Sequence, residues 1–182
     1  MTTRLLLAGA MALLFPACAS MHHKQMQGIH MAGQTGTTSK AGSRMTVRTT
    51  AYTHTEAGGV KNGVGGRLRF KSPVRSAAAD WSWLPLGTRF CLCSDQEKQQ
   101  YVIEDYGSAL VGKQTIDMYM PSMRMVNQWG VRHVEIEILE WGSKAMSLKL
   151  LEGRQRRDHV RQMVAALRRQ GVKTLVATAS PG

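Results

Sequence analysis

The sequence predicts a mainly β fold: a compact barrel of six or seven short strands with one short helix, followed by a basic C-terminal helix. Short segments in the middle of the chain alternate apolar and polar residues and favour Val, Thr and Tyr, as half-buried strands do. Turns with Gly, Pro or several polar residues separate these segments at short spacing, which is typical of β-barrels rather than parallel α/β sheets. No repeat of solenoid or propeller length occurs.

The predicted strands follow one another through the middle of the chain. The first is followed by a loop, residues 56–66, that holds five glycines, and the turn at residues 84–88 leads into a later strand. A polar turn at residues 95–99 and a Gly-containing loop at residues 106–114 separate the next ones. The predicted strands are residues 45–55, 67–70, 75–79, 89–93, 101–104, 115–120 and 131–139.

Two helices are predicted. The first begins at Pro121, a residue favoured in the first helical turn, and ends near Trp129 because Gly130 stops it. The second, residues 154–170, is basic and either packs its apolar stripe on the barrel or lies on a membrane surface. The stripe has helical spacing and consists of Val160, Met163, Val164 and Leu167.

A chain of 182 residues has room for one domain with flanking segments. We expect a signal peptide, a flexible tether, the barrel domain and a basic helix with its tail. The tether is predicted because it is rich in Gly, Ser, Thr, Gln, Met and His and lacks periodicity. In that order the four segments are residues 1–19, 20–45, 46–141 and 142–182.

The N-terminus has the pattern of a secretory signal. Arg4 supplies the positive charge, and residues 5–15 form an apolar run that is too short to span a bilayer. Cleavage after Ala19 would release the protein, whereas cleavage before Cys18 would expose that cysteine for lipidation. Residues 15–18 match the lipoprotein signal only in part, so both outcomes stay open. Either one predicts export, to the periplasm or to the envelope with an outer-membrane anchor.

Neither a metal site nor a cofactor is predicted. The tether histidines have no partner ligand at a fixed spacing, and a C-x-C pair without a second pair does not form a structural zinc site. Cys91 and Cys93 would point to the same face of a strand, where a disulfide between them would be strained. We therefore expect buried thiols there.

The net charge of +12 lies in the terminal segments. Residues 46–141 contain 11 basic and 10 acidic residues, so the predicted barrel is almost neutral. A nucleic-acid-binding domain carries its basic residues on the folded unit, and no nucleic-acid partner is predicted. The basic tails are either solvated or attracted to an anionic surface of the envelope. The sequence carries no signal for an oligomeric state.

Three aspartates lie in or beside the predicted strands. Asp80 follows three alanines, Asp105 ends an apolar strand, and Asp117 lies inside one, although strands are depleted in Asp. Carboxyl groups close together in a partly buried site have raised pKa values, which suits a general acid near neutral pH. The alternative is that these aspartates bind backbone N–H groups in turns.

Several motifs occur in order along the predicted barrel, and they resemble the 3D domain, which is named for three aspartates. This domain is similar to the catalytic domain of membrane-bound lytic transglycosylase A and of the stationary-phase-survival wall enzymes. The resemblance extends over residues 46–141. The motifs are Ala78-Ala79-Asp80, residues 84–88, residues 104–110, Gly112, Ile116-Asp117-Met118-Tyr119 and residues 129–132.

The resemblance implies a double-psi β-barrel and a peptidoglycan lytic transglycosylase. Asp117 would be the single acid and base that breaks the bond between N-acetylmuramic acid and N-acetylglucosamine and forms a 1,6-anhydro sugar. Asp105 and Asp80 would support it. The partner would be the peptidoglycan glycan strand, without a cofactor. The aromatic side chains of Tyr52, Trp81 and Tyr106 would either stack on sugar rings or belong to the core.

The sequence departs from the family pattern where sugars would bind. Ser108 and Val111 replace a usual glycine and lysine, and Trp81 and Trp83 lie where proline and small residues are common. The chain also has no room for the second domain of larger relatives. Three alternatives therefore stay open: a non-catalytic wall-binding module, an envelope interaction protein that works through the basic helix, and a hydrolase that uses water.

Overall fold

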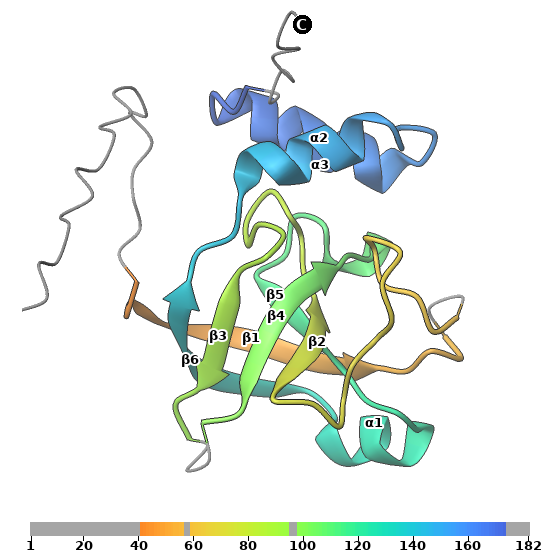
Figure 1. Cartoon of the computed structure of the whole chain (residues 1–182), viewed down its shortest axis with the longest axis vertical. Coiled ribbons are helices and arrows are strands. Elements are labelled where there is room, and N and C mark those ends of the chain that lie inside the picture. Colours follow the sequence, from red (N-terminus) through yellow and green to blue (C-terminus); the bar gives the residue numbers. More distant parts are fainter. Residues whose placement is uncertain (1–40, 57–58, 95–97, 174–182) are drawn as a thin grey trace, which may run out of the picture. The chain divides into compact units, whose positions relative to one another are not determined.

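A computed structural model describes residues 41–56, 59–94 and 98–173 (Figure 1). The predicted signal peptide, Cys18, the tether histidines and most of the tether lie outside the described residues. None of the helices in the described part of the chain is long and apolar enough to cross a membrane.

Six strands close into a barrel in the order β1-β5-β2-β4-β3-β6 (Figure 1). The predicted β-barrel of six or seven strands is therefore confirmed, with six. The strands are β1 (Arg44–Tyr52), β2 (Val74–Ala78), β3 (Arg89–Leu92), β4 (Gln100–Asp105), β5 (Thr115–Tyr119) and β6 (Arg132–Glu140).

The strand pairing has an internal two-fold pattern. The pairs β1–β5 and β2–β4 are parallel, and the other four pairs are antiparallel. If β1 is exchanged with β4, β2 with β5 and β3 with β6, the same six strand pairs result, each still parallel or antiparallel as before. Two equivalent halves that cross over in this way match the double-psi topology implied by the resemblance.

The core fills the barrel with the inward-facing residues of alternating strands. Ala77 and Ala79 from the region of β2 and Ile116 and Met118 from β5 are fully buried in it. Because successive side chains of a strand point to opposite faces, Asp117, between Ile116 and Met118, faces outward. A second, smaller cluster covers part of this outer face and consists of Tyr52, Leu68, Ala78, Leu110 and Tyr119.

The predicted strand at residues 67–70 is wrong. Among the described residues, only an isolated bridge between Lys61 and Arg67 occurs there. The segment instead packs Leu68 into the outer cluster, and the Leu68 N–H donates to the Val60 carbonyl at 2.9 Å. The apolar residues of this segment thus reflect the burial of Leu68 against the outer cluster rather than strand pairing.

Three α-helices follow or interrupt the barrel. The two predicted helices occur as α1 (Met123–Trp129) and α3 (Asp158–Arg169), and a 3-10 helix, η1 (Ser108–Leu110), lies in the loop after β4. Helix α2 (Lys144–Glu152) was not predicted. Its sequence has no evident apolar stripe, since Leu148 and Leu151 are the only apolar residues of this helix that are buried. Its N-cap, Ser143, accepts the Met146 N–H at 3.1 Å and was the available signal.

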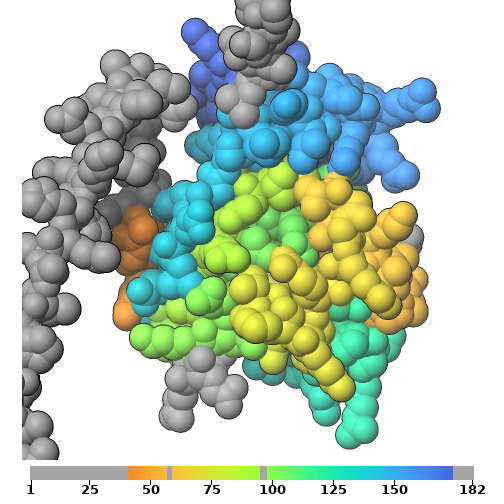
Figure 2. All heavy atoms as spheres, viewed as in Figure 1, coloured from red at the N-terminus to blue at the C-terminus, as the bar shows by residue number. Residues whose placement is uncertain are grey.

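Helices α2 and α3 lie side by side across one end of the barrel (Figure 1) and share its core. The predicted apolar stripe of α3 is buried, which is the packing alternative rather than a membrane-facing one. Figure 2 shows the atoms of these helices in direct contact with the strands and loops beneath them. Cys91 is buried, Cys93 is half-buried, and no disulfide joins them.

Candidate active site

Two of the three aspartates lie in one row on the outer face of the barrel. In the sheet, Ala78 of β2 pairs with Asp117 of β5 on one side and with Asp105 of β4 on the other. Thr50 of β1 pairs with Asp117 and extends the row. Adjacent strands are about 4.8 Å apart, so the two aspartates are separated by one strand, on which Ala78 lies between them and is buried in the outer cluster.

Asp117 has one occupied and one available carboxylate oxygen. The Thr50 hydroxyl donates to its Oδ1 at 2.7 Å, and no described residue donates to Oδ2. Burial raises the pKa of Asp117 above its ordinary value of 3.8, the Thr50 hydrogen bond and Arg48 oppose the rise, and the charges of Glu56 and Asp105 add to it. This carboxyl group can therefore hold a proton and present it at Oδ2.

Asp105 is held by more donors. Its Oδ1 accepts the Tyr106 N–H at 2.9 Å, and its Oδ2 accepts the Tyr52 hydroxyl at 3.0 Å. Burial raises the pKa of Asp105, whereas these two donors and the Gly63 N–H oppose the rise. Each donor favours the ionised form of Asp105, so hydrogen bonding opposes the effect of burial more at Asp105 than at Asp117, where Thr50 is the only donor among the described residues.

Tyr52 interacts with both acids, by a hydrogen bond with Asp105 and electrostatically with Asp117. Its ring is only 7% exposed and contacts the Tyr119 ring edge-on at 5.6 Å between centroids. Burial, followed by the charges of Asp105 and Asp117, raises the pKa of Tyr52, so its hydroxyl stays protonated and donates to Asp105. A predicted substrate-binding residue is thus a hydrogen-bond partner within the acidic row.

Tyr119 and His54 were missed by the sequence reasoning. The Tyr119 hydroxyl lies 3.2 Å from His54 Nδ1, and the rings are tilted at 6.4 Å between centroids. Tyr119 is two residues after Asp117, and His54 is two residues after Tyr52. Because residues two apart in a strand point to the same face, strand alternation could have placed both on the face of the aspartates. They extend the polar outer face beyond the aspartate row.

Asp80 lies apart from this row and has a different environment. Its side chain is 3% exposed, and its Oδ1 accepts the backbone N–H of Ser82 at 2.8 Å and the Ser82 hydroxyl at 2.6 Å. Its Oδ2 accepts the Gly112 N–H at 2.8 Å. Gly112 has φ +73°, which glycine adopts without strain. Asp80 therefore joins the turn after β2 to the loop before β5.

Trp81 supports Asp105 from inside the core. Its ring is completely buried, its Nε1–H donates to the Asp105 carbonyl at 2.9 Å, and its ring lies 4.8 Å from that of Tyr106. This burial argues against the predicted stacking of Trp81 on a ligand. Tyr106 is half-buried and has an exposed part.

A glycine and an arginine fix the loop that faces Asp105. A Cβ atom on Gly63 would lie 3.0 Å from the Tyr106 ring and 3.2 Å from Asp105 Oδ1, so only glycine fits without displacement. Arg154, in the turn between α2 and α3, donates to the Gly63 carbonyl and lies 3.5 Å from the Tyr106 hydroxyl. The C-terminal hairpin thereby reaches the site.

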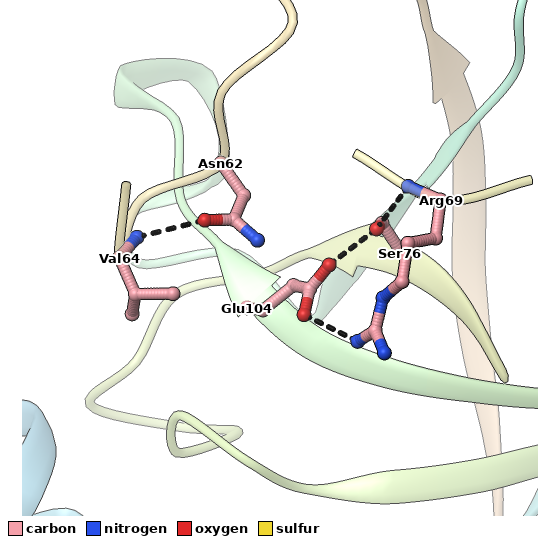
Figure 3. A network of polar contacts seen from close by, with 5 residues as sticks. All are labelled: Asn62, Val64, Arg69, Ser76 and Glu104. Carbon is pink, nitrogen blue, oxygen red and sulfur yellow. Dashed lines mark hydrogen bonds and ion pairs between the residues drawn. The ribbon is translucent and has the colours of Figure 1, made fainter. Parts of the chain in front are cut away.

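A second set of polar contacts holds the rest of that loop (Figure 3). Glu104, only 8% exposed, accepts the Ser76 hydroxyl and an Arg69 N–H at 2.5 Å, and the Arg69 backbone N–H donates to the Ser76 hydroxyl at 2.8 Å. Nearby, the Asn62 side chain accepts the Val64 N–H at 3.2 Å. The loop is therefore tied to β2 and β4, next to Asp105.

Two open surface hollows are lined by described residues, and neither includes Asp105 or Asp117. One, of about 550 Å³, is lined by Thr46, Arg48, Lys113, Gln114, Thr115 and His133. The other, of about 370 Å³, includes Asp80, Trp83 and Lys144. Among the described residues, no three His, Cys, Asp or Glu side chains are placed to hold one metal ion.

Comparisons with known proteins agree with the predicted resemblance over part of the chain. Residues 75–140 match the family model of the 3D domain, a segment that contains all three aspartates but begins after β1. Two crystal structures of MltA from Escherichia coli are similar at 23% identity with a TM-score of 0.34. A variant of the same E. coli lytic transglycosylase is similar at 20% identity with a TM-score of 0.35.

Each of these matches covers 46% of this chain and 28% of the other. The chain therefore corresponds to little more than a quarter of those proteins. A search of curated proteins found no match.

Proposed function

We propose that this chain, whose residues 75–140 match the 3D domain, is a peptidoglycan lytic transglycosylase that uses Asp117 as its single acid and base. The observation that supports this most is the difference between the two acids of the outer row. Burial raises the pKa of both acids, but Asp117 has one carboxylate oxygen without a described donor, whereas both carboxylate oxygens of Asp105 accept hydrogen bonds. A general acid needs a pKa raised toward neutral pH and an accessible oxygen, and the raised pKa of Asp117 and its Oδ2 support this role.

The proposed reaction conserves atoms without water. Protonated Asp117 donates its proton to the oxygen between N-acetylmuramic acid and N-acetylglucosamine, and the bond from C1 to that oxygen breaks. The muramoyl C6 hydroxyl then attacks C1, and the Asp117 carboxylate accepts the hydroxyl proton. The products are a 1,6-anhydromuramic end and a free 4-hydroxyl, and Asp117 is protonated again. An ordinary glycosidase would divide these roles between two carboxyl groups.

Asp105, Tyr52 and Asp80 have supporting roles in this proposal. The negative charge of Asp105 adds to the rise in the pKa of Asp117, and Tyr52 holds the Asp105 carboxylate in place. Tyr106 is the predicted aromatic residue with an exposed part that a sugar ring could contact. Asp80 acts through the fold, because its carboxylate binds Ser82 and Gly112.

The proposed setting is the bacterial envelope, where the substrate is. The secretory pattern of residues 1–19 supports export, and lipidation of Cys18 would anchor the protein to a membrane. The glycan strand of peptidoglycan is the proposed partner.

The decisive experiment is digestion of purified sacculi followed by mass spectrometry of the soluble products. The wild type should release anhydro-muropeptides, and Asp117→Asn should release none. Asp158→Asn is the matched control, because the Asp158 side chain is 80% exposed on α3. Equal release by Asp117→Asn would exclude Asp117 as the acid, and reducing muramic ends instead of anhydro ends would indicate a hydrolase.

A non-catalytic wall-binding module is the second candidate. It is favoured by the surface hollow of about 550 Å³, because a hollow lined by residues other than the three aspartates can bind a ligand without chemistry at those aspartates. A binding module would be pulled down by sacculi yet release no soluble product from them.

A further inference from the structure

A cationic hollow lies on the same outer face as Asp117. It has a volume of about 550 Å³, and its lining includes the basic residues Arg48, Lys113 and His133 and no acidic residue. Arg48, Lys113 and His133 are all exposed, and none of them forms an ion pair with a described residue. Arg48 acts electrostatically on Asp117 but is not paired with it, so the charge of the hollow is available to a ligand.

Strand pairing places the hollow next to the proposed acid. In the parallel pairing of β1 with β5, Arg48 lies opposite Thr115 and Thr50 lies opposite Asp117. The first pair is two residues before the second along both strands, so both pairs lie on the same face of the sheet, one pleat apart. Two residues of a strand advance about 7 Å, which is roughly the width of one sugar ring. His133 of β6 pairs with Arg48 and closes the far side.

A neighbouring acid does not cancel this charge. Glu135 pairs with Thr46 at the outer edge of the hollow, but its carboxylate lies 4.0 Å from Arg44 instead. The polar side chains of Thr46, Gln114 and Thr115 also line the hollow and can complete the hydrogen bonding of an anionic group.

We propose that this hollow binds a carboxylate of the peptide side chain carried by the wall glycan, and so selects peptide-bearing strands for the aspartate row. The inference rests on the proposed function for its substrate. Arg and Lys side chains bind carboxylates through charge-assisted hydrogen bonds, and Arg can do so with two parallel bonds. A carboxylate held at Arg48 and Lys113 would position the substituted sugar one pleat away from Asp117.

The test measures binding of the full chain to soluble peptide-bearing glycan fragments by calorimetry. The same fragments with their carboxylates converted to amides serve as the neutral ligand. The wild type should bind the carboxylate form about tenfold more tightly, with a preference that weakens as salt is added. Arg48→Gln and Lys113→Gln should each reduce this preference, and the double variant should abolish it. Lys149→Gln removes one exposed positive charge on α2 and should keep it.

The outcomes separate this inference from the proposed reaction. Equal binding of the two forms by the wild type, or an undiminished preference in the double variant, would overturn the carboxylate site. Phosphate that competes while the two glycan forms bind alike would point to an adventitious anion site and would also overturn it. A retained preference together with no release of anhydro-muropeptides would support the site and reject only the lytic reaction.

Discussion

The Tyr52 hydroxyl donates a 3.0 Å hydrogen bond to Asp105 Oδ2, and this bond joins the end of β1 to the end of β4. The strand β5, which carries Asp117, lies beside β1, and β2 separates it from β4. The bond thus fixes the carboxylate whose charge adds to the rise in the pKa of Asp117. Removing it tests whether the two acids work together.

The first prediction concerns Tyr52→Phe. The ring contact with Tyr119 can remain, but Asp105 loses a donor that favours its ionised form, so the pKa of Asp105 should rise further. The free energy of unfolding should fall by about 1.5–3 kcal/mol, the usual net contribution of a hydrogen bond to a charged group. Carboxyl carbon NMR over a pH titration measures the Asp105 pKa directly. An unchanged or lower pKa would show that the bond has no influence on the acid pair.

The second prediction concerns Gly63→Ala. The added Cβ would meet the Tyr106 ring at 3.0 Å and Asp105 Oδ1 at 3.2 Å, so both must move. We expect a loss of about 1–3 kcal/mol in the free energy of unfolding, as for overpacked sites, together with weaker release of muropeptides. Urea denaturation measures the first effect.

Gly153→Ala is the matched control for that substitution. Gly153 has φ −74° at the end of α2, and nothing lies within 4 Å of its added Cβ. It should be neutral or slightly stabilising. Equal losses for the two variants would mean that the close approach at Gly63 is not what matters.

The third prediction concerns Asp80→Asn. An amide would place an NH₂ group against the donors of Ser82 or Gly112 and leave a buried polar group without a partner. Unfolding should become easier by about 1–3 kcal/mol. The pKa of Asp117, followed by NMR, should not change, because Asp80 is not hydrogen-bonded to the acidic row. A shifted Asp117 pKa with unchanged stability would instead place Asp80 in the chemistry.

The fourth prediction concerns Leu167→Ala on α3. Leu167 is fully buried in the core shared with the barrel, so the truncation should cost about 2–5 kcal/mol. Helices α2 and α3 and the barrel strands should unfold together in one transition at a lower temperature. Val131→Ala, at a position 59% exposed, is the control with little expected effect. Separate transitions for helices and barrel would indicate that α3 is an independent appendage, as the envelope-interaction alternative requires.

The sequence was sufficient to predict those strands and helices whose own apolar periodicity shows their type and extent. Alternation along 115–120 and 131–139 predicted β5 and β6 almost to their ends, and the stripe that includes Val160 and Leu167 predicted α3. Helix α2 escaped because few of its residues are buried. Alternation within a strand also gave the outward direction of Asp117, although not its neighbours.

The candidate site was predictable only in part, because its contacts join distant segments. All three aspartates were predicted from the sequence. Their spacing does not show that Asp80 stabilises a turn, whereas Asp105 and Asp117 lie on either side of Ala78 in the sheet. Gly63 and Arg154 are 91 residues apart and meet only in the fold. Trp81 reads as an aromatic candidate for sugar stacking until its burial places it behind Asp105.

The last prediction concerns the pH dependence of stability in Asp117→Asn. Burial raises the pKa of Asp117 in the folded state above its ordinary value of 3.8, so the folded protein binds more protons than the unfolded chain between these two values. The stabilisation that results is complete below pH 3.8 and is lost as the pH rises through the folded-state pKa. At neutral pH the ionised Asp117 therefore opposes folding.

An asparagine removes that charge and can keep the hydrogen bond from Thr50 to Oδ1. The variant should therefore melt a few degrees higher than the wild type at pH 7, about 2–5 °C for a domain of this size, and the difference should vanish near pH 3. Thermal melts across this pH range provide the measurement. A variant that is less stable at pH 7 would show that the Asp117 carboxylate is a structural anchor, which would remove the physical basis for its role as the acid.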